Sequence, residues 1–211
     1  MIATRLPDKT IERLSQYRRV LLVHLGQGKQ HIFSHELAAM LHITPVQVRR
    51  DIMLIAHTGT LRRGYDVREL VNMISRIIDS DTGAKVIVMG VGLLGSAIIN
   101  YFTGKRSKLT IVGAFDIDPD KVNRVYAGVP CYPVDKLREI IKAEDIDIAL
   151  LTVPPSEAVN TTERLVMAGI KGILNYTSTP VNVPPHVYLE EYDMITSLEK
   201  VAYFVKKKKS K

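Results

Sequence analysis

Cysteine is nearly absent from this chain, which has a single one, Cys131, among its 211 residues. One cysteine excludes an internal disulfide and a metal site built from several cysteines, so we interpret Cys131 as a structural thiol. The sequence also lacks an apolar run long enough to cross a membrane, and its first residues lack the pattern of a signal peptide. We therefore expect a soluble cytoplasmic protein that binds no metal.

Charge of one sign is in modest excess, with a formal net charge of +7. Residues 1–83 carry 12 basic and 8 acidic side chains, a net +4, and five further lysines lie in the tail 206–211. Basic charge thus belongs to the N-terminal part and the tail, which weakly favours nucleic acid bound at one end of the protein. We interpret the lysine tail as a solvated, disordered chain end, with contact to DNA as the less favoured alternative.

A glycine-rich turn between a strand and a helix organises the second half of the chain. Val86–Met89 is an unbroken apolar run, typical of a parallel strand that is covered on both faces. Gly90, Gly92 and Gly95 follow at the spacing G-x-G-x-x-G, which suits a tight turn, close approach of a pyrophosphate, and close packing of helix on strand. The predicted cofactor residues at this turn are Gly90, Val91, Gly92, Leu93, Leu94 and Gly95.

An acidic residue follows at the position that a dinucleotide site requires. A second strand, Leu109–Phe115, ends at Asp116, about 20 residues beyond the last glycine, where a ribose-binding acid belongs. Asp116, with Asp118 close by, would repel an adenosine 2′-phosphate, so the pattern favours NAD(H) over NADP(H). A glycine turn without a ligand, and a flavin or S-adenosylmethionine in the same fold, are the alternatives.

Strands and helices alternate through residues 84–192, which predicts a doubly wound parallel sheet whose ligand lies beyond the carboxyl ends of the strands. The loops after Val153 and Asn175 should then face the same crevice as the glycine turn. Within this Rossmann-type domain we expect Asp118 to open a further helix. Tyr101 lies late on the helix after the glycine turn, where it could approach the crevice or pack in the core, and core is the default for a tyrosine on an apolar face.

The N-terminal part has the pattern of a helix-turn-helix. Asp8 is placed to cap a first helix and Ser34 a short second one. Thr44 caps a third helix with Pro45 at its first position, and Gln47 completes a capping box. Two short helices with a tight turn between them, the second opening on polar and basic residues, are typical of a motif whose second helix enters the major groove.

The third helix divides into a core face and an outward face. The predicted core face consists of Val48, Ile52 and Ile55. Gln47, Arg49 and Arg50 are then available to DNA, where arginine can grip guanine and glutamine can pair with adenine. A three-helix bundle whose arginines are merely solvated is the alternative.

The segment Thr58–Tyr65 resembles a β-hairpin that carries two arginines, the wing of a winged helix. Arg62 and Arg63 could reach phosphates or a minor groove. Asp66 caps a fourth helix, and a polar run ends the domain, so residues 1–83 form the predicted winged-helix domain. The predicted DNA-binding residues are Ser34, Thr44, Gln47, Arg49, Arg50, Arg62 and Arg63.

Residues 193–211 form the last segment of the chain. Apolar residues recur at helical spacing from Ile195 to Val205 and are followed by four consecutive lysines. The segment is too short to be a substrate domain. We expect a helix that packs on its own domain or on a second subunit.

The order of these parts resembles the Rex family of redox-sensing transcriptional repressors, and the resemblance covers nearly the whole chain. It rests on Thr-Pro-Val-Gln-Val-Arg-Arg-Asp at 44–51, Gly-Tyr-Asp-Val at 64–67, Gly-Val-Gly-Leu-Leu-Gly-Ser-Ala at 90–97 and Ala-Phe-Asp-Ile-Asp at 114–118. The chain departs from the family at 55–59, where Ile-Ala-His-Thr-Gly replaces Phe-Gly repeats, and at 176–180, where Tyr-Thr-Ser-Thr-Pro replaces Ala-Pro.

The resemblance implies a homodimer that binds an inverted-repeat operator when NADH is low and leaves it when NADH fills both nucleotide sites. NADH and NAD⁺ are then the cofactors, and the protein is not an enzyme. The resemblance also implies that the terminal helix is swapped between subunits. By motif alignment, the residues of the switch near the nicotinamide fall on Arg19, Tyr101 and Asp193, of which Tyr101 and Asp193 also count as cofactor-binding.

Two rival classes stay open from the residues alone. One is an NAD-dependent oxidoreductase with an added N-terminal bundle, and the other is a CoA-type nucleotide-binding subunit of a larger enzyme. Against the oxidoreductase, no acid–base pair or histidine-centred cluster is evident beyond the Rossmann half, and too little chain is left for a substrate domain. Binding to palindromic DNA separates a repressor from both rivals.

Overall fold

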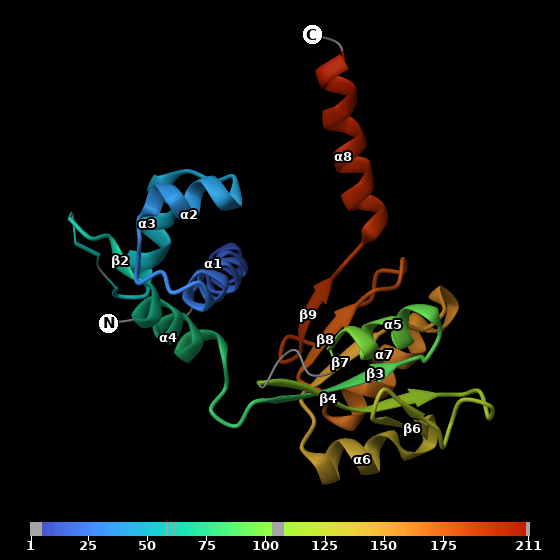
Figure 1. Ribbon diagram of the computed structural model, residues 1–211. Coiled ribbons are helices and arrows are strands. Elements are labelled where there is room, and N and C mark those ends of the chain that lie inside the picture. The colour runs from blue at the N-terminus through green and yellow to red at the C-terminus, as the bar shows by residue number, and fades with distance from the viewer. Residues whose placement is uncertain (1–5, 58, 61, 103–107, 210–211) are drawn as a thin grey trace. The chain divides into compact units, whose positions relative to one another are not determined.

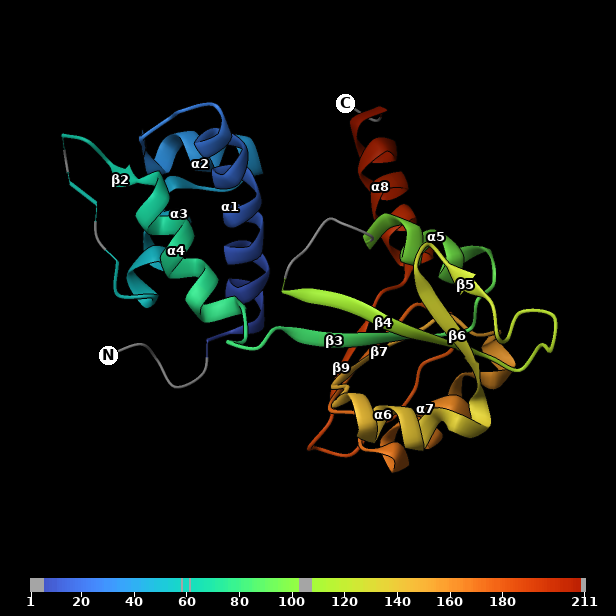
Figure 2. The same ribbon diagram turned by 60° about the horizontal axis from the view of Figure 1, so that its bottom comes forward.

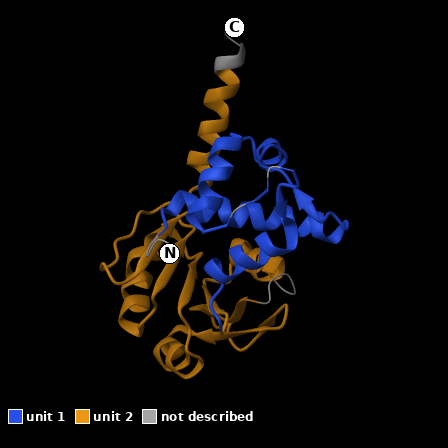
Figure 3. Cartoon of the chain, turned by 90° about the vertical axis from the view of Figure 1, so that its left-hand side faces the viewer, with its two compact units in different colours: residues 1–81 blue, residues 82–211 orange. Residues whose placement is uncertain are grey.

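The structure, a computed structural model, describes the chain except residues 1–5, 58, 61, 103–107 and 210–211. The chain divides into two compact units, residues 1–81 (unit 1) and residues 82–211 (unit 2), as Figure 3 shows. The division falls within the polar run that the sequence predicts as a boundary. Each unit has a hydrophobic core of its own.

Unit 1 is a helical domain with one short two-stranded sheet (Figure 1). Its elements are α1 (Asp8–Gly26), β1 (His31–Ile32), α2 (Ser34–Leu41), α3 (Pro45–Leu54), β2 (Tyr65–Asp66) and α4 (Val67–Ile78). Strands β1 and β2 pair antiparallel, so the chain after α3 returns beside the start of α2. The predicted core face of α3 is confirmed, because the fully buried side chains of this unit include Leu14, Tyr17, Leu21, Val48, Ile52, Ile55, Leu70 and Ile74.

The helix starts of unit 1 confirm two predicted caps and correct two others. The hydroxyl of Thr44 and the carboxylate of Asp66 each accept the backbone N–H three residues on, at 3.2 and 2.8 Å. Asp8 and Ser34, by contrast, are the first residues of α1 and α2 and cap neither helix. At α2 the carboxylate of Glu36 takes this role instead, since it accepts a backbone N–H at the helix start at 2.7 Å.

Unit 2 is a parallel sheet with helices on both faces (Figures 1 and 2). Its elements are β3 (Ala84–Met89), α5 (Leu93–Phe102), β4 (Leu109–Asp116), β5 (Val125–Tyr126), β6 (Val129–Pro133), α6 (Leu137–Glu144), β7 (Ile148–Leu151), α7 (Ala158–Ala168), β8 (Gly172–Asn175), β9 (Tyr188–Glu191) and α8 (Met194–Lys209). The strands lie in the order β5-β6-β4-β3-β7-β8-β9, and all but β5 are parallel. Without β5 the order is that of a doubly wound dinucleotide-binding fold. The predicted doubly wound parallel sheet is confirmed.

Successive side chains of β3 point to opposite faces of the sheet and pack against different helices. Ile87 and Met89 of β3 pack with α6 and α7, whereas Val86 and Val88 pack with α5. Figure 2 shows α5 on one side of the sheet and α6 and α7 on the other. Because both faces are covered, the apolar run of β3 is continuous, as predicted for a buried parallel strand.

Two parts of unit 2 differ from the sequence-based expectation. Asp118 opens no helix in the described residues, and the chain makes turns that lead into β5. The carboxylates of Asp116 and Asp118 each accept the N–H two residues on, at 3.0 and 2.9 Å, and such local bonds favour turns over helix. The edge strand β9 escaped prediction because only Leu189 in it is even half-buried, so it has no apolar pattern.

The sequence predicts that α8 packs either on its own domain or on a second subunit, and in the described residues it does not pack on the rest of unit 2. Half or more of each of these apolar side chains is exposed: Met194, Ile195, Leu198, Val201, Phe204 and Val205. Asp193 caps the helix, and hydrogen bonds from Thr196 and Ile195 hold the pKa of its carboxyl below the ordinary value. Neither α8 nor any other helix in the described part of the chain is long and apolar enough to cross a membrane.

A buried carboxylate ties α1 to α3 in unit 1. Asp51 has no exposed surface and accepts hydrogen bonds from Arg13 at 2.6 and 2.8 Å. It also accepts from Tyr17 at 2.7 Å and Gln47 at 3.0 Å. Burial by itself would raise the pKa of Asp51, but these hydrogen bonds outweigh burial and hold the pKa below its ordinary value. An ionised group therefore fixes the position of α3 against α1.

We predict that Asp51→Asn lowers the free energy of unfolding by about 2 to 3 kcal/mol at neutral pH, because Arg13 loses its ionised partner in a buried site. The folded-state pKa of Asp51 is lowered, so its contribution is present above the unfolded-state pKa, about 3.9, and is lost as pH falls through the folded value. The difference between wild type and variant should narrow below about pH 4. Urea unfolding, monitored by circular dichroism at several pH values, measures this difference in unfolding free energy.

Glu12→Gln is the control for this prediction, because Glu12 forms an exposed ion pair with Lys9. Such a pair contributes about 0.5 kcal/mol or less. Equal losses in the two variants, or a loss in Asp51→Asn that does not change with pH, would contradict the prediction.

Candidate functional site

The glycine turn after β3 is held from both sides by neighbouring strands. The N–H of Gly90 donates to the carbonyl of Phe115 in β4 at 2.8 Å. On the other side the hydroxyl of Thr152, which follows β7, donates to the carbonyl of Gly90 at 2.8 Å. The turn is therefore fixed by the protein itself.

The three glycines of the turn have different structural roles. Gly90 has a φ of +91°, in the left-handed region that residues with a side chain rarely adopt. A Cβ at Gly95 would collide with the carbonyl oxygen of Gly90, because α5 lies close against the end of β3. A Cβ at Gly92 would meet no protein atom within 4 Å. The tight turn and the close helix packing are thus confirmed, and the backbone of Gly92 borders open space.

A cavity of 610 Å³ lies beyond the carboxyl ends of β3, β4 and β7. Here the strand order reverses, which is where doubly wound sheets bind their ligands. The predicted cofactor residues that line the cavity are Gly90, Gly92, Leu93, Leu94 and Asp116. The loop after β7 also lines it through Thr152, Val153 and Pro154. The loop after Asn175 does not line this cavity but contacts the loop after β7, because Thr179 donates to the carbonyl of Pro155 at 3.0 Å.

Asp116 lies buried at the edge of this cavity with both carboxylate oxygens engaged. One oxygen accepts the N–H of Val91 at 2.7 Å, and the other accepts the N–H of Asp118 at 3.0 Å. The ammonium of Lys121 lies 3.5 Å from Asp116 and 3.4 Å from Asp118. Val91 is itself buried, so it contributes to the site through its backbone bond to Asp116 and does not line the cavity.

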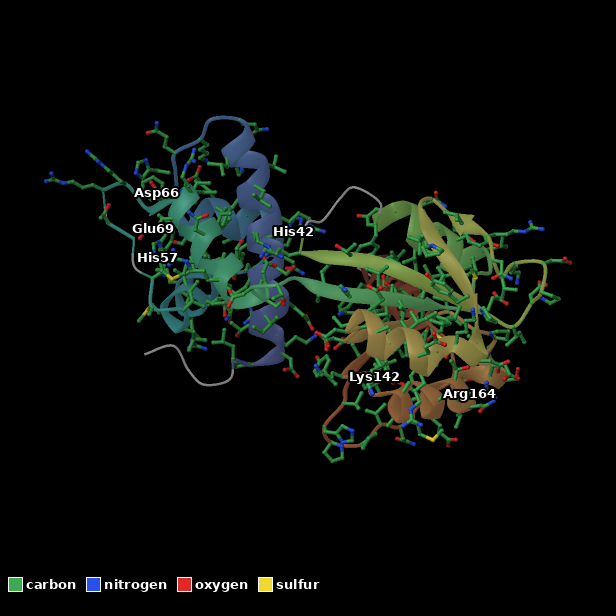
Figure 4. The ribbon with its side chains drawn as sticks, turned by 90° about the horizontal axis from the view of Figure 1, so that it is seen from below. His42, His57, Asp66, Glu69, Lys142 and Arg164 are labelled. Atoms are coloured by element: carbon green, nitrogen blue, oxygen red, sulfur yellow. The ribbon has the colours of Figure 1, made fainter. Side chains whose placement is uncertain are left out.

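One face of α7 and the turn before it supply lining residues that sequence reasoning missed. Glu157, Asn160, Thr161 and Arg164 follow one another at helical spacing along the cavity, and Figure 4 labels Arg164. Lys121 also lines the cavity, and no sequence pattern predicted this position. Polar residues on a surface helix are ordinary, so their spacing acquires meaning only once the strand order has placed α7 beside the glycine turn.

Tyr101 and Asp193 are not among the residues that line the cavity. Tyr101 is 63% exposed near the end of α5, so the default interpretation of this tyrosine as a core residue is wrong. Its ring packs against that of Phe102, with ring centres 5.7 Å apart. Asp193 is exposed and caps α8. The assignment of both residues to a nucleotide-dependent switch stays a prediction.

The single cysteine lies in β6, where it pairs with Ala114 of β4. Cys131 is buried, and burial together with the charge of Asp116 raises the pKa of its thiol to about 11. Cys131 belongs to the hydrophobic core of the sheet, as expected of a structural thiol. Among the described residues, no group of three or more His, Cys, Asp or Glu side chains is placed to hold a metal ion.

The outward face of α3 carries the side chains predicted to contact DNA. Arg49 and Arg50 are exposed, and Arg49 donates to the hydroxyl of Ser34 at 3.2 Å, which links α2 to α3. Gln47 is half-buried, and its amide nitrogen donates to Asp51. Gln47 thus belongs in part to the buried carboxylate network, and of the predicted capping box only the bond to Thr44 is found among the described residues.

The predicted wing is a tight turn closed by one residue pair in the part of the chain that the structure describes. Thr60 and Gly64 form an antiparallel bridge whose two N–H···O bonds measure 2.9 and 2.8 Å. Arg62 and Arg63 are exposed between them. Two residues of the predicted hairpin lie outside the described residues.

The connection from α3 to this turn folds back onto the core of unit 1. His57 is buried and packs against the ring of Tyr65, with ring centres 5.9 Å apart. Figure 4 shows His57 beside Glu69 of α4, whose carboxylate lies 3.9 Å from its Nδ1. The histidine at the position where the sequence departs from the Rex pattern therefore anchors the base of the wing.

Two adjacent arginines of α1 have different surroundings. Arg18 is buried, and its guanidinium donates to Asp79 at 2.7 Å. Arg19 is exposed and forms no hydrogen bond or ion pair with the residues that the structure describes. Of the two, Arg19 is the one whose guanidinium is available to another group.

Comparison with known protein families finds one match in each unit. Residues 5–52 match the family described as "Putative DNA-binding protein N-terminus", and residues 81–179 match the family described as "CoA binding domain". The first match covers the helix-turn-helix, and the second covers the parallel sheet with its glycine turn.

Curated relatives match this chain over nearly its whole length. The redox-sensing transcriptional repressor Rex of Geobacillus kaustophilus is 39% identical over 96% of this chain and 94% of its own. That of Lactobacillus acidophilus is 35% identical over 97% of each. The crystal structure of RSP, a Rex-family repressor, in complex with β-NAD⁺ and operator DNA is 33% identical and covers 98% of this chain and 95% of its own, with a TM-score of 0.88. This chain belongs to the Rex family of redox-sensing transcriptional repressors.

Proposed function

We propose that this protein is a repressor that binds operator DNA when NADH is scarce and releases the DNA when NADH binds. The observation that carries the proposal is the preformed turn with open backbone at Gly92, beside Asp116, in a chain whose other unit presents Arg49 and Arg50 on a helix-turn-helix. The relative RSP has been solved with β-NAD⁺ and operator DNA and with β-NADH, which supports both ligands here.

The chemistry of the cavity fits a dinucleotide. The open space beside Gly92 lies at the start of α5, where unpaired N–H groups and the helix dipole favour a pyrophosphate. Asp116 is oriented by its bonds from Val91 and Asp118 and can accept a ribose hydroxyl. Leu93 and Pro154 add apolar surface to the lining. NADH and NAD⁺ are therefore the ligands that we assign to this cavity.

Charge at the ribose end favours NAD(H) over NADP(H). Asp116 and Asp118 place two carboxylates there, and Lys121 is the cation that lies near both. The backbone N–H of Asp120 and the ammonium of Lys121 hold the pKa of Asp118 below its ordinary value, so this carboxylate is ionised at neutral pH. A 2′-phosphate would meet the surplus negative charge.

Discrimination between the two oxidation states needs no catalysis. The oxidised nicotinamide ring carries a positive charge and the reduced ring carries none, so a closed, apolar pocket disfavours NAD⁺ through desolvation. A hundredfold preference for NADH corresponds to about 3 kcal/mol. We propose that the protein is a sensor and not an enzyme, a proposal supported by its relatives, which are named redox-sensing transcriptional repressors.

The exposed apolar face of α8 supports a homodimer. A surface helix gains most of its stability from packing of such a face, and here the described residues of the same chain do not cover it. Exchange of α8 between two subunits would cover it. A two-fold dimer then matches an inverted-repeat operator, whose half-sites mirror the symmetry of the protein. Since its target is genomic DNA, we place the repressor in the cytoplasm.

Arg19, Tyr101 and Asp193 form the switch in this proposal. Arg19 has an available guanidinium on α1 of the DNA-binding unit. Tyr101 has a largely exposed ring, and Asp193 has an ionised carboxylate whose pKa is lowered. These three groups are of the kind that can form different contacts in the DNA-bound and NADH-bound states.

We predict that the full-length protein binds palindromic DNA selected from a randomised pool, and that its affinity falls by about tenfold or more as NADH replaces NAD⁺ at constant total nucleotide. Fluorescence anisotropy of labelled DNA measures this, with a non-palindromic duplex of equal composition as control. Linkage requires that the operator weakens NADH binding by the same factor, which calorimetry measures. Unchanged NADH affinity in the presence of operator would reject the switch.

We predict that Gly92→Ala weakens NADH binding by about tenfold or more and changes the free energy of unfolding by about 0.5 kcal/mol or less, because the new methyl group meets only ligand space. Gly95→Ala is the matched comparison. Its methyl group would overlap the carbonyl of Gly90, so the unfolding free energy falls by about 2 kcal/mol. Calorimetry with NADH and thermal denaturation separate the two effects. Wild-type NADH affinity in Gly92→Ala would show that the pyrophosphate lies elsewhere.

We predict that Arg19→Ala binds NADH like wild type. The ratio of its operator affinities without and with NADH should be about tenfold smaller than that of wild type, because an available guanidinium of the switch is gone. Arg76→Ala is the matched control, since Arg76 is also an exposed arginine of unit 1 and its loss removes the same charge. Anisotropy with and without NADH gives the ratio for each variant. The same ratio in both variants would remove Arg19 from the switch.

A further inference from the structure

The outward face of α3 carries two exposed apolar side chains as well as two arginines. Val46 is 58% exposed and Met53 is 70% exposed, and Arg49 and Arg50 lie between them along the helix. A groove of 530 Å³ runs along this face and is lined by Val46, Arg49, Arg50, Met53 and Leu54. The opposite face of the helix is buried, and Leu54 packs against the core of unit 1, whereas Val46 and Met53 do not belong to that core.

The folding of unit 1 does not account for a valine at position 46. A β-branched residue is a poorer helix former than Gln, Glu, Lys or Arg, and Val46 lies outside the core. Its backbone is well defined, because Thr44 caps the helix and Asp51 ties α3 to α1. A branched side chain on such a backbone presents two methyl groups in a nearly constant direction.

The position and chemistry of this side chain point to one feature of DNA. The N-terminal residues of a recognition helix contact base edges in the major groove, and Val46 is the second residue of α3. Thymine is the base that presents an apolar group there, its C5-methyl. We propose that Val46 packs against the methyl group of one thymine in each operator half-site and so determines specificity at that base pair. The inference rests on the proposed function of the chain as an operator-binding repressor.

Arg50 and Met53 lie on the same face of α3 but differ from Val46 in what they can recognise. Arg50 forms no hydrogen bond or ion pair with the described residues, so it is available for a guanine or a phosphate beside the thymine. Met53 lies two turns further along the helix and is unbranched and flexible, which makes it a poor discriminator of one methyl group. Val46 is thus the apolar side chain of this face that is best suited to read a base.

The test replaces thymine by deoxyuridine, which removes only the methyl group. The full-length protein first selects its operator from a randomised duplex pool, and each thymine is then replaced in turn. Each half-site should contain one thymine whose replacement by uracil, made in that half-site alone, weakens binding by about fourfold. This is the effect of burying one methyl group. Fluorescence anisotropy at one fixed salt concentration gives the affinities, since phosphate contacts make every value salt-dependent.

Two variants test whether the side chain of Val46 causes the preference for thymine. Val46→Ala should bind the thymine and uracil operators about equally, because the contact that distinguishes them is gone. Val23→Ala is the matched control: Val23 is 57% exposed on α1, and its variant should keep the full preference for thymine. Thermal denaturation of both variants should show wild-type stability, since neither valine belongs to the core.

The outcomes separate this inference from the function on which it rests. A selected operator that responds to NADH, but whose uracil scan is flat or is unchanged by Val46→Ala, overturns the valine contact alone. A pool from which the protein selects no sequence overturns both. A uracil effect that disappears in Val46→Ala and persists in Val23→Ala establishes the contact.

Discussion

The nucleotide unit depends on the close approach of α5 to the end of β3. Gly95 lets the helix lie against the carbonyl of Gly90, while Thr152 binds the same carbonyl from the end of β7. Phe115 holds the turn from β4. Three strands therefore meet at one turn, and the crevice opens where they end. A side chain at position 95 would push the turn away from these bonds, so the packing that stabilises the unit also shapes its site.

The DNA-binding unit depends on a charge in place of a close backbone contact. A buried carboxylate is costly unless hydrogen bonds satisfy it, and Asp51 receives them from α1 and from its own helix. This arrangement holds the inward face of α3 in one position. The outward face, with Arg49, Arg50 and Val46, is then presented in a constant orientation, which direct recognition of bases requires.

The glycine turn and the outward face of α3 are each fixed by contacts within their own unit, so in the proposed switch a response to NADH has to come from groups that have no role inside either unit. Arg19 and the apolar face of α8 are such groups in the described part of the chain. A ligand shifts an equilibrium only through a difference in affinity between two states. Groups without internal partners can form contacts in one state and lose them in the other, whereas the Gly90 turn and the Asp51 network cannot change without loss of packing.

The sequence by itself determined the features that arise within a few residues: the caps at Thr44 and Asp66, the limits of α5, and the glycine turn with an acid after the next strand. Caps and periodicity act over one helical turn, so local patterns reveal them. Only the tertiary structure decided that Arg164 lines the crevice and that Gln47 donates a hydrogen bond to Asp51. Those roles arise when strand order and helix packing bring distant segments together, and no local pattern encodes that meeting.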